Sequence, residues 1–235
     1  YRTNAQSRPI EAALRQARIP YVIVRGTSFY ERAEVKDAAA YLRLALEPRS
    51  DLDLDRVVNK PPRGIGEKTL ERLHAHARAR GVALFDALAD VDAIALQGAP
   101  ETERGFAAST HLEGLKPAAR RALGSLREVL AGLARDAPAL DAGIAVQEVL
   151  DRTGLLARLE AEHTPEATDR AENLMELLAA AREFDEAAAG TPPPREPEEP
   201  VPPPLARLLE QIELLGEAAQ PTPEGCVVPA TVLAP

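Results

Sequence analysis

Two glycines separated by one isoleucine, Gly64 to Gly66, form the most informative short pattern in the sequence. Glycine permits positive φ angles and lets another backbone come close. A helix is expected to begin directly after this turn, so its free N–H groups and the positive end of its dipole would face the turn. That geometry suits a phosphate oxygen. A plain tight turn between two packed helices is the equally weighted alternative, because glycine turns of this kind are common.

The side chains around the turn suit the same chemistry. Arg63 and Lys68 flank it, and Thr69 offers a hydroxyl. Ile65 either anchors the turn in the core or touches the minor groove of a nucleic acid. Residues 59–73 hold four basic residues against two acidic ones, whereas the whole chain of 235 residues has a formal net charge of -9. That acidic balance argues against broad, unspecific nucleic-acid binding, so any such contact would be local.

The usual catalytic devices are not recognisable in the sequence, and no catalytic residue is predicted. There is no G-x-x-x-x-G-K-[ST] phosphate loop, and the glycine turn lacks the third glycine of a dinucleotide fingerprint. His74 and His76 are two residues apart on an expected helix, so they point to different faces. The single cysteine, Cys226, makes a metal site improbable and rules out a disulfide within the chain.

The sequence also bears on the cellular compartment of the protein and on whether the chain is part of a longer one. One cysteine favours a reducing compartment. No apolar run approaches the roughly 20 residues of a membrane span, and no signal peptide is recognisable. The default expectation is a soluble cytoplasmic protein. The chain opens at Tyr1 without an initiator methionine and stops after a strand-like run, so we expect it to be a piece of something larger.

Apolar periodicity and capping residues predict a mainly helical chain. One strand is expected at residues 21–24 and another in the tail at 227–233, whereas residues 90–115 have weak periodicity and are expected to be a loop. Helices are expected over 7–17, 31–46, 51–58, from Leu70 onward, and over 84–89, 117–134, 144–152, 166–189 and 205–216.

A proline-rich stretch interrupts this pattern. Eight of the fourteen residues at 191–204 are proline, which predicts an extended, semi-rigid linker. A proline-rich motif for a binding partner is the less favoured alternative. Strand sequence at both ends with helices between them indicates a mainly α fold, in which a helical domain is inserted into an incomplete α/β domain.

Four segments occur in an order and at separations that carry a family resemblance. They read "YRTNAQSR" (1–8), "FYERAEVKDAAAYLRL" (29–44), "NKPPRGIGEKTLERL" (59–73) and "RAENLMELLAAAREF" (170–184). Together they resemble the second half of UvrD/PcrA/Rep-type superfamily I DNA helicases. The tail resembles the start of a later family motif and keeps Thr231, but Leu233 stands where the family has histidine.

The resemblance implies a division into parts and a function. It implies that residues 1–46 are a partial RecA-like 2A segment, that 47–216 are a helical 2B-like domain containing the linker, and that 217–235 return towards 2A. It implies a fragment of an ATP-dependent 3′–5′ DNA helicase, with ATP and Mg²⁺ used by the full-length parent and no cofactor in this chain. A stand-alone, non-enzymatic DNA- or protein-binding module derived from such a helicase is the alternative.

The resemblance also implies residue roles. Arg2 and Asn4 would meet the backbone of single-stranded DNA, whereas Ser28 stands where a further basic contact is common, with Arg25 nearby. The turn would approach duplex DNA through Arg63, Gly64, Ile65, Gly66, Lys68 and Thr69. The charged residues at 31–37, together with Glu172 and Asn173, are expected to be structural. The implied partners are DNA, the remainder of the helicase, and repair or replication proteins.

Overall fold

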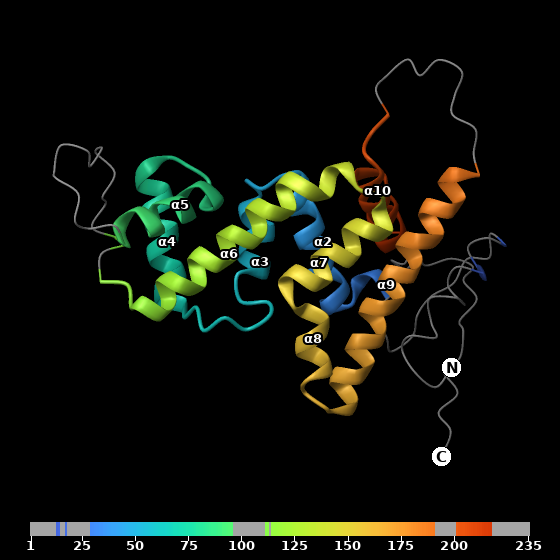
Figure 1. The fold of residues 1–235 in the computed structure, drawn as a ribbon, viewed down its shortest axis with the longest axis horizontal. Helices are drawn as coiled ribbons and strands as arrows, with labels where there is room; N and C mark the ends of the chain where they lie inside the picture. Colours follow the sequence, from blue (N-terminus) through green and yellow to red (C-terminus); the bar gives the residue numbers. More distant parts are fainter. Residues whose placement is uncertain are drawn as a thin grey trace, which may run out of the picture. The chain divides into compact units, whose positions relative to one another are not determined.

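The computed structural model describes residues 13–14, 17, 29–95, 111–112, 114–190 and 201–217. Within these residues every regular element is a helix and none is a strand (Figure 1), which confirms the mainly α prediction. The elements are η2 (Phe29–Glu31), α2 (Ala33–Leu46), α3 (Asp51–Val57), α4 (Glu67–Arg80), α5 (Leu84–Ala95), α6 (Pro117–Asp136), η4 (Ala137–Ala139), α7 (Ala142–Thr153), α8 (Leu155–Glu160), α9 (Pro165–Ala189) and α10 (Pro204–Glu217).

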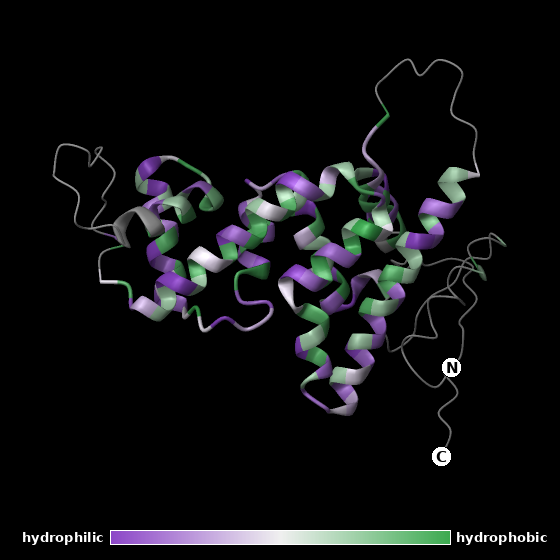
Figure 2. Cartoon of the chain, viewed as in Figure 1, coloured by the Kyte–Doolittle hydropathy of each residue, from purple (hydrophilic) through white to green (hydrophobic). Residues whose placement is uncertain are grey.

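The chain divides into two compact units. One comprises residues 40–137, and the other comprises residues 1–39 together with 138–235. This division differs from the predicted segments 1–46, 47–216 and 217–235, and that assignment to subdomains stays a prediction. Figure 2 shows hydrophilic and hydrophobic residues mixed along each helix, as amphipathic helices require.

The unit of residues 40–137 is built around α5, which packs against α3, α4 and α6. Ser50 caps α3, because its hydroxyl accepts a hydrogen bond from the N–H of Asp53. The carboxylate of Asp51 in turn accepts from the N–H of Leu84 at 2.8 Å and so caps α5. Fully buried leucines fill the space between these helices, among them Leu54, Leu73, Leu88, Leu123 and Leu126.

The described part of the other unit is centred on α9, which packs against α7, α8 and α10. Thr164 caps α9 by accepting from the N–H of Ala167, and Pro165 occupies its first turn. Leu174, Leu177 and Ala181 are buried on its inner face. The helix α10 also contacts η2, so segments far apart in the sequence share this unit.

Several predicted boundaries need correction. The loop predicted at 90–115 was wrong at its start, because α5 continues to Ala95 with Val91 buried and Asp90 paired with His76. The short helix α8 was not predicted. The linker predicted at 191–204 ends sooner, since Pro204 already begins α10. The strands predicted at 21–24 and 227–233, and most of the helix at 7–17, lie outside the described residues. None of the described helices has the length and apolarity needed to cross a membrane.

Candidate nucleic-acid interface

The glycine turn connects the end of α3 to the start of α4 (Figure 1). Gly64 has φ of +71°, a left-handed conformation that L side chains adopt only with strain, so this position requires glycine. Gly66 is the N-cap of α4 with extended backbone, φ -77° and ψ 160°, which any residue can adopt. The two glycines of the turn therefore differ, because the backbone demands only the first of them.

Ile65 holds the turn against the core. The residue is 4% exposed, so it is a core anchor and the alternative of a minor-groove contact is not supported. The side-chain amide of Asn59 also holds the turn. Its Oδ1 accepts from the N–H of Arg63 at 2.9 Å and from that of Ile65 at 3.3 Å. Its Nδ2 donates to the carbonyl of Ile65 at 2.5 Å. One amide thus fixes both polar groups of Ile65.

Arg63 turns inward rather than outward. Its Nη1 donates to the carbonyls of Val57 and Lys60, both at 3.0 Å, and its Nη2 donates to the hydroxyl of Tyr41 at 2.7 Å. The guanidinium carbon also lies 5.9 Å from the centroid of the Tyr41 ring. These contacts direct the donors of Arg63 at the protein, so they do not support the predicted contact of its side chain with phosphate.

The outward face of the turn is formed by Gly64, Gly66 and Lys68, which are all exposed, with Thr69 half-buried beside them. Among the residues that the structure describes, nothing lies within 4 Å of where a Cβ would stand on either glycine. Gly66 provides no side-chain cap, and the N–H groups of Thr69 and Leu70 bond to its carbonyl. The N–H groups of Glu67 and Lys68 therefore have no acceptor within the helix. They and the positive end of the helix dipole face open space.

Arg2 and Asn4, with Arg25 and Ser28, are outside the described residues. The histidines of α4 point to different faces as predicted, because His74 pairs with Asp55 of α3 and His76 pairs with Asp90 of α5, each at 2.8 Å. In the described part of the chain no group of histidine, cysteine, aspartate and glutamate could hold a metal ion.

The structural role predicted for the charged start of α2 is confirmed for its main members. The guanidinium of Arg32 is buried, donates to the Oδ1 of Asn173 and lies 5.3 Å from the centroid of the Phe29 ring. Asn173 donates in turn to Glu34, and Lys36 pairs with Glu31. Asn173 thus links α9 to the start of α2, within one unit.

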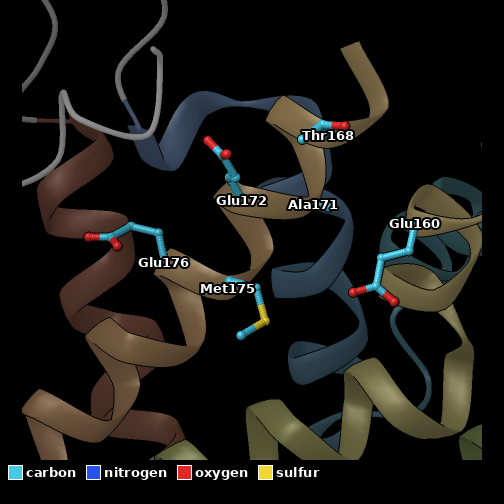
Figure 3. Close-up of a pocket in the computed structure, with 6 residues that line it drawn as sticks. All are labelled: Glu160, Thr168, Ala171, Glu172, Met175 and Glu176. Carbon is cyan, nitrogen blue, oxygen red and sulfur yellow. The ribbon is translucent and has the colours of Figure 1, made fainter. Parts of the chain in front are cut away.

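Glu172 behaves differently from Asn173. It is exposed and lines an open groove of about 570 Å³ between α8 and α9, together with Glu160, Thr168, Ala171, Met175 and Glu176. In Figure 3 the carboxylates of Glu172 and Glu176 extend away from Glu160. Three carboxylates around one groove would repel a phosphate, so this groove does not compete with the glycine turn as a nucleic-acid contact.

Comparison with known proteins identifies the family of the chain. The model of the UvrD-like helicase C-terminal domain matches residues 1–224. The chain belongs to this family. The chain is also 37% identical to the ATP-dependent DNA helicase PcrA of Bacillus subtilis over 186 residues, which is 79% of this chain and 23% of that protein. It is 33% and 32% identical to the PcrA proteins of Staphylococcus epidermidis and Staphylococcus aureus, with the same coverage.

This membership of the UvrD-like family confirms the resemblance carried by the four sequence segments. The chain spans about a quarter of the length of these curated relatives. The sequence interpretation missed two residues that hold the turn, Tyr41 of α2 and Asn59. Asn59 opens the segment that carries the pattern, but a buried tyrosine eighteen residues earlier gives no local signal of its contact with the turn.

Proposed function

We propose that the outward face of the glycine turn binds the sugar–phosphate backbone of duplex DNA, as the duplex-contacting 2B module of a longer DNA helicase. One observation carries the proposal: the N-terminus of α4 has no side-chain cap bond, and no described residue fills the space beside Gly66. Serine, threonine, aspartate and asparagine supply a side-chain oxygen at such a position, whereas glycine, which is also common there, supplies none. A glycine leaves the N–H groups available to an acceptor from outside the chain.

The local charges support an anion at this point. Lys68 lies in the first turn of α4 and is exposed, close to the N–H groups that have no acceptor within the helix. The pairing of Arg63 with carbonyl oxygens reduces the number of side-chain charges that can reach a phosphate. Contacts of this kind position a protein on a duplex and read no bases, so binding should be independent of sequence. With a net charge of -9 opposing approach, affinity should fall near the ~10⁻⁴–10⁻⁶ M of unspecific binding.

The wider proposal concerns the longer protein. Its relatives are named ATP-dependent DNA helicases, and we infer the same activity for it, with 3′–5′ translocation, ATP and Mg²⁺. This chain has no phosphate-loop motif of its own, so no step of ATP hydrolysis is assigned to its residues. The N-terminal segment would belong to subdomain 2A, with Arg2 and Asn4 on the single strand. A cytoplasmic location and repair or replication partners belong to the same proposal.

A non-enzymatic binding module is the second candidate. The formal net charge of -9 favours it, because an acidic surface suits protein partners better than DNA. The coding sequence on either side of this chain distinguishes the two. A phosphate loop upstream supports the helicase, whereas a start codon and a stop codon at the present ends support the module.

A titration of labelled duplex with Gly66→Asp tests the proposed interface. The backbone of Gly66 accepts any residue, and the space beside it is open, so this variant should fold. Its carboxylate would accept from the N–H groups of α4 and repel phosphate. Binding should therefore fall at least tenfold while the free energy of unfolding stays equal or rises by a few tenths of a kcal/mol.

Two comparisons separate charge from capping. Gly66→Asn occupies the same N–H groups without a charge, and it should weaken binding less than Gly66→Asp does. Arg78→Glu adds negative charge at the far end of the same helix, about 15 Å from Lys68, and it should change binding far less than Lys68→Glu. Equal duplex affinity for Gly66→Asp and the parent chain would show that the turn is only a turn.

A further inference from the structure

The turn joins two helix ends of opposite polarity. The negative, carbonyl end of α3 lies at Val57, and the positive, N–H end of α4 lies at Glu67. A phosphate attracted by the second end would be repelled by the first if both were open. The guanidinium of Arg63 lies on the carbonyls of Val57 and Lys60, with those of Val58 and Pro61 at 3.4 and 3.3 Å. It therefore covers the negative end while leaving the positive end open.

Tyr41 holds this guanidinium in place from the core. It is fully buried, and its hydroxyl donates to the carbonyl of Lys60 at 2.5 Å while accepting from Arg63 at 2.7 Å. The same hydroxyl lies 3.2 Å from the carbonyl of Val57. Tyr41 and Arg63 thus share two carbonyl acceptors, one at each side of the end of α3. A tyrosine with no exposed surface cannot touch DNA.

Asn59 completes the arrangement on the side of Ile65. Its amide accepts from two N–H groups and donates to one carbonyl, so three of its four bonding positions are used within six residues. Backbone groups that are already hydrogen-bonded lose little further conformational entropy when a ligand binds, which is the advantage of a pre-organised site.

We propose that Tyr41, Asn59 and Arg63 are positioning residues that hold the glycine turn in its DNA-binding shape, and that Arg63 acts without touching phosphate. This inference rests on the proposed function. It differs from a direct role for Arg63 in one clear respect. A phosphate contact needs only the charge of Arg63. The arrangement of Tyr41, Asn59 and Arg63, called the brace below, needs the planar, forked guanidinium, which lysine lacks.

Arg63→Lys, Arg63→Gln and Tyr41→Phe in the full chain test the brace, with duplex affinity, thermal unfolding and amide exchange measured on each. We expect both Arg63 variants to weaken duplex binding by about the same factor, roughly tenfold. Tyr41→Phe should weaken it roughly three- to tenfold, the effect of one lost hydrogen bond. In all three variants, the N–H of Ile65 should exchange faster than it does in the parent chain. The N–H groups within α4 and α5 should exchange as they do in the parent.

Two control variants and the combination of results distinguish the proposed DNA interface from the positioning role of Tyr41, Asn59 and Arg63. Tyr30→Phe removes a hydroxyl from η2 in the other unit, and Arg78→Lys is the same exchange at the far end of α4; both should bind as the parent does. If Arg63→Lys retains binding while Arg63→Gln loses it, Arg63 touches phosphate and the brace is wrong. If Gly66→Asp loses binding while Tyr41→Phe and Arg63→Lys match the parent, only the brace fails. If Gly66→Asp also matches the parent, the interface itself fails and this inference fails with it.

Discussion

The starts of α4 and α7 both carry glycine, and they use it in opposite ways. At α7, the N–H groups of Ala142 and Gly143 bond to the two carboxylate oxygens of Asp185 on α9, at 3.0 and 2.7 Å. A Cβ on Gly143 would stand 2.8 Å from the Cγ of Arg182. At α4, Gly66 has no side-chain cap bond, and no described atom lies within 4 Å of where its Cβ would stand.

The difference shows what each glycine serves. At Gly143 a neighbouring helix of the same unit comes close to the backbone, so a contact within the described structure explains why this residue is glycine. At Gly66 the described structure contains no such neighbour, and the backbone geometry makes no demand either. Two physical reasons for glycine remain there: its ordinary use as an N-cap, and close approach by something outside the described residues. The contrast supports the proposed DNA contact without depending on the charge of the chain.

The largest expected effect comes from alanine at the crowded start. Gly143→Ala should lower the free energy of unfolding by about 1–3 kcal/mol, because the new methyl group overlaps Arg182. Gly66→Ala should cost less, about 0.5–1 kcal/mol, because its methyl group meets no described atom and the cost is only that of alanine at an N-cap. Urea unfolding followed by far-ultraviolet circular dichroism measures both. Equal values for the two variants would remove the contrast between the two helix starts.

Removing the cap of α7 should have the next largest effect. Asp185→Ala leaves two N–H groups without their acceptor and should cost about 1–2 kcal/mol, the upper range for a lost cap. Asp185→Asn keeps one acceptor oxygen and should cost less. Asp141→Ala is the matched control, because Asp141 is the N-cap by position but makes no cap bond with its side chain. If the control costs as much as Asp185→Ala, then Asp185 is not the working cap.

The sequence predicted the positions of the helices well, but it predicted the contacts between residues of different helices poorly. Periodicity predicted helices at 51–58, 117–134 and 166–189, close to α3, α6 and α9, because this signal lies within one element. The continuation of α5 to Ala95 was missed, since it depends on contacts such as that between Asp90 and His76 on another helix. The cap that Asp185 provides to α7 comes from forty-two residues away from Gly143, and no local pattern encodes it.

The candidate site was predicted with similar limits. The pattern of two glycines located the turn, because positive φ and helix initiation are local properties. The direction of Arg63 was not predictable, since it depends on Tyr41 reaching the turn from α2. From sequence, Arg63 and Lys68 are two equivalent basic residues beside one turn. The structure separates them into an inward arginine and an exposed lysine.

A smaller effect is expected for the charge of Lys68. Lys68→Gln should reduce the steepness of log affinity against log salt by about 0.9, the value for one phosphate contact. The parent slope itself should be shallow, roughly -1 to -2, because few charges are engaged. Arg78→Gln, at the other end of α4, should leave the slope unchanged. A slope that is the same for Lys68→Gln and the parent would exclude Lys68 from contact with phosphate.

The smallest expected effect is a gain in stability at Gly66 itself. Serine at this N-cap supplies an oxygen for the open N–H groups of α4, and it restricts the unfolded chain more than glycine does. Gly66→Ser should therefore raise the free energy of unfolding by about 0.5 kcal/mol while weakening duplex binding, because its hydroxyl occupies the donors that we propose bind phosphate. Gly64→Ser, two residues earlier, should instead lower it by roughly 1–2 kcal/mol, since φ is +71° there. Opposite signs for stability and binding at Gly66 are the behaviour of a helix start kept open for a ligand. A variant that gains stability and binds duplex as the parent does would mean that the open N-terminus of α4 serves no ligand.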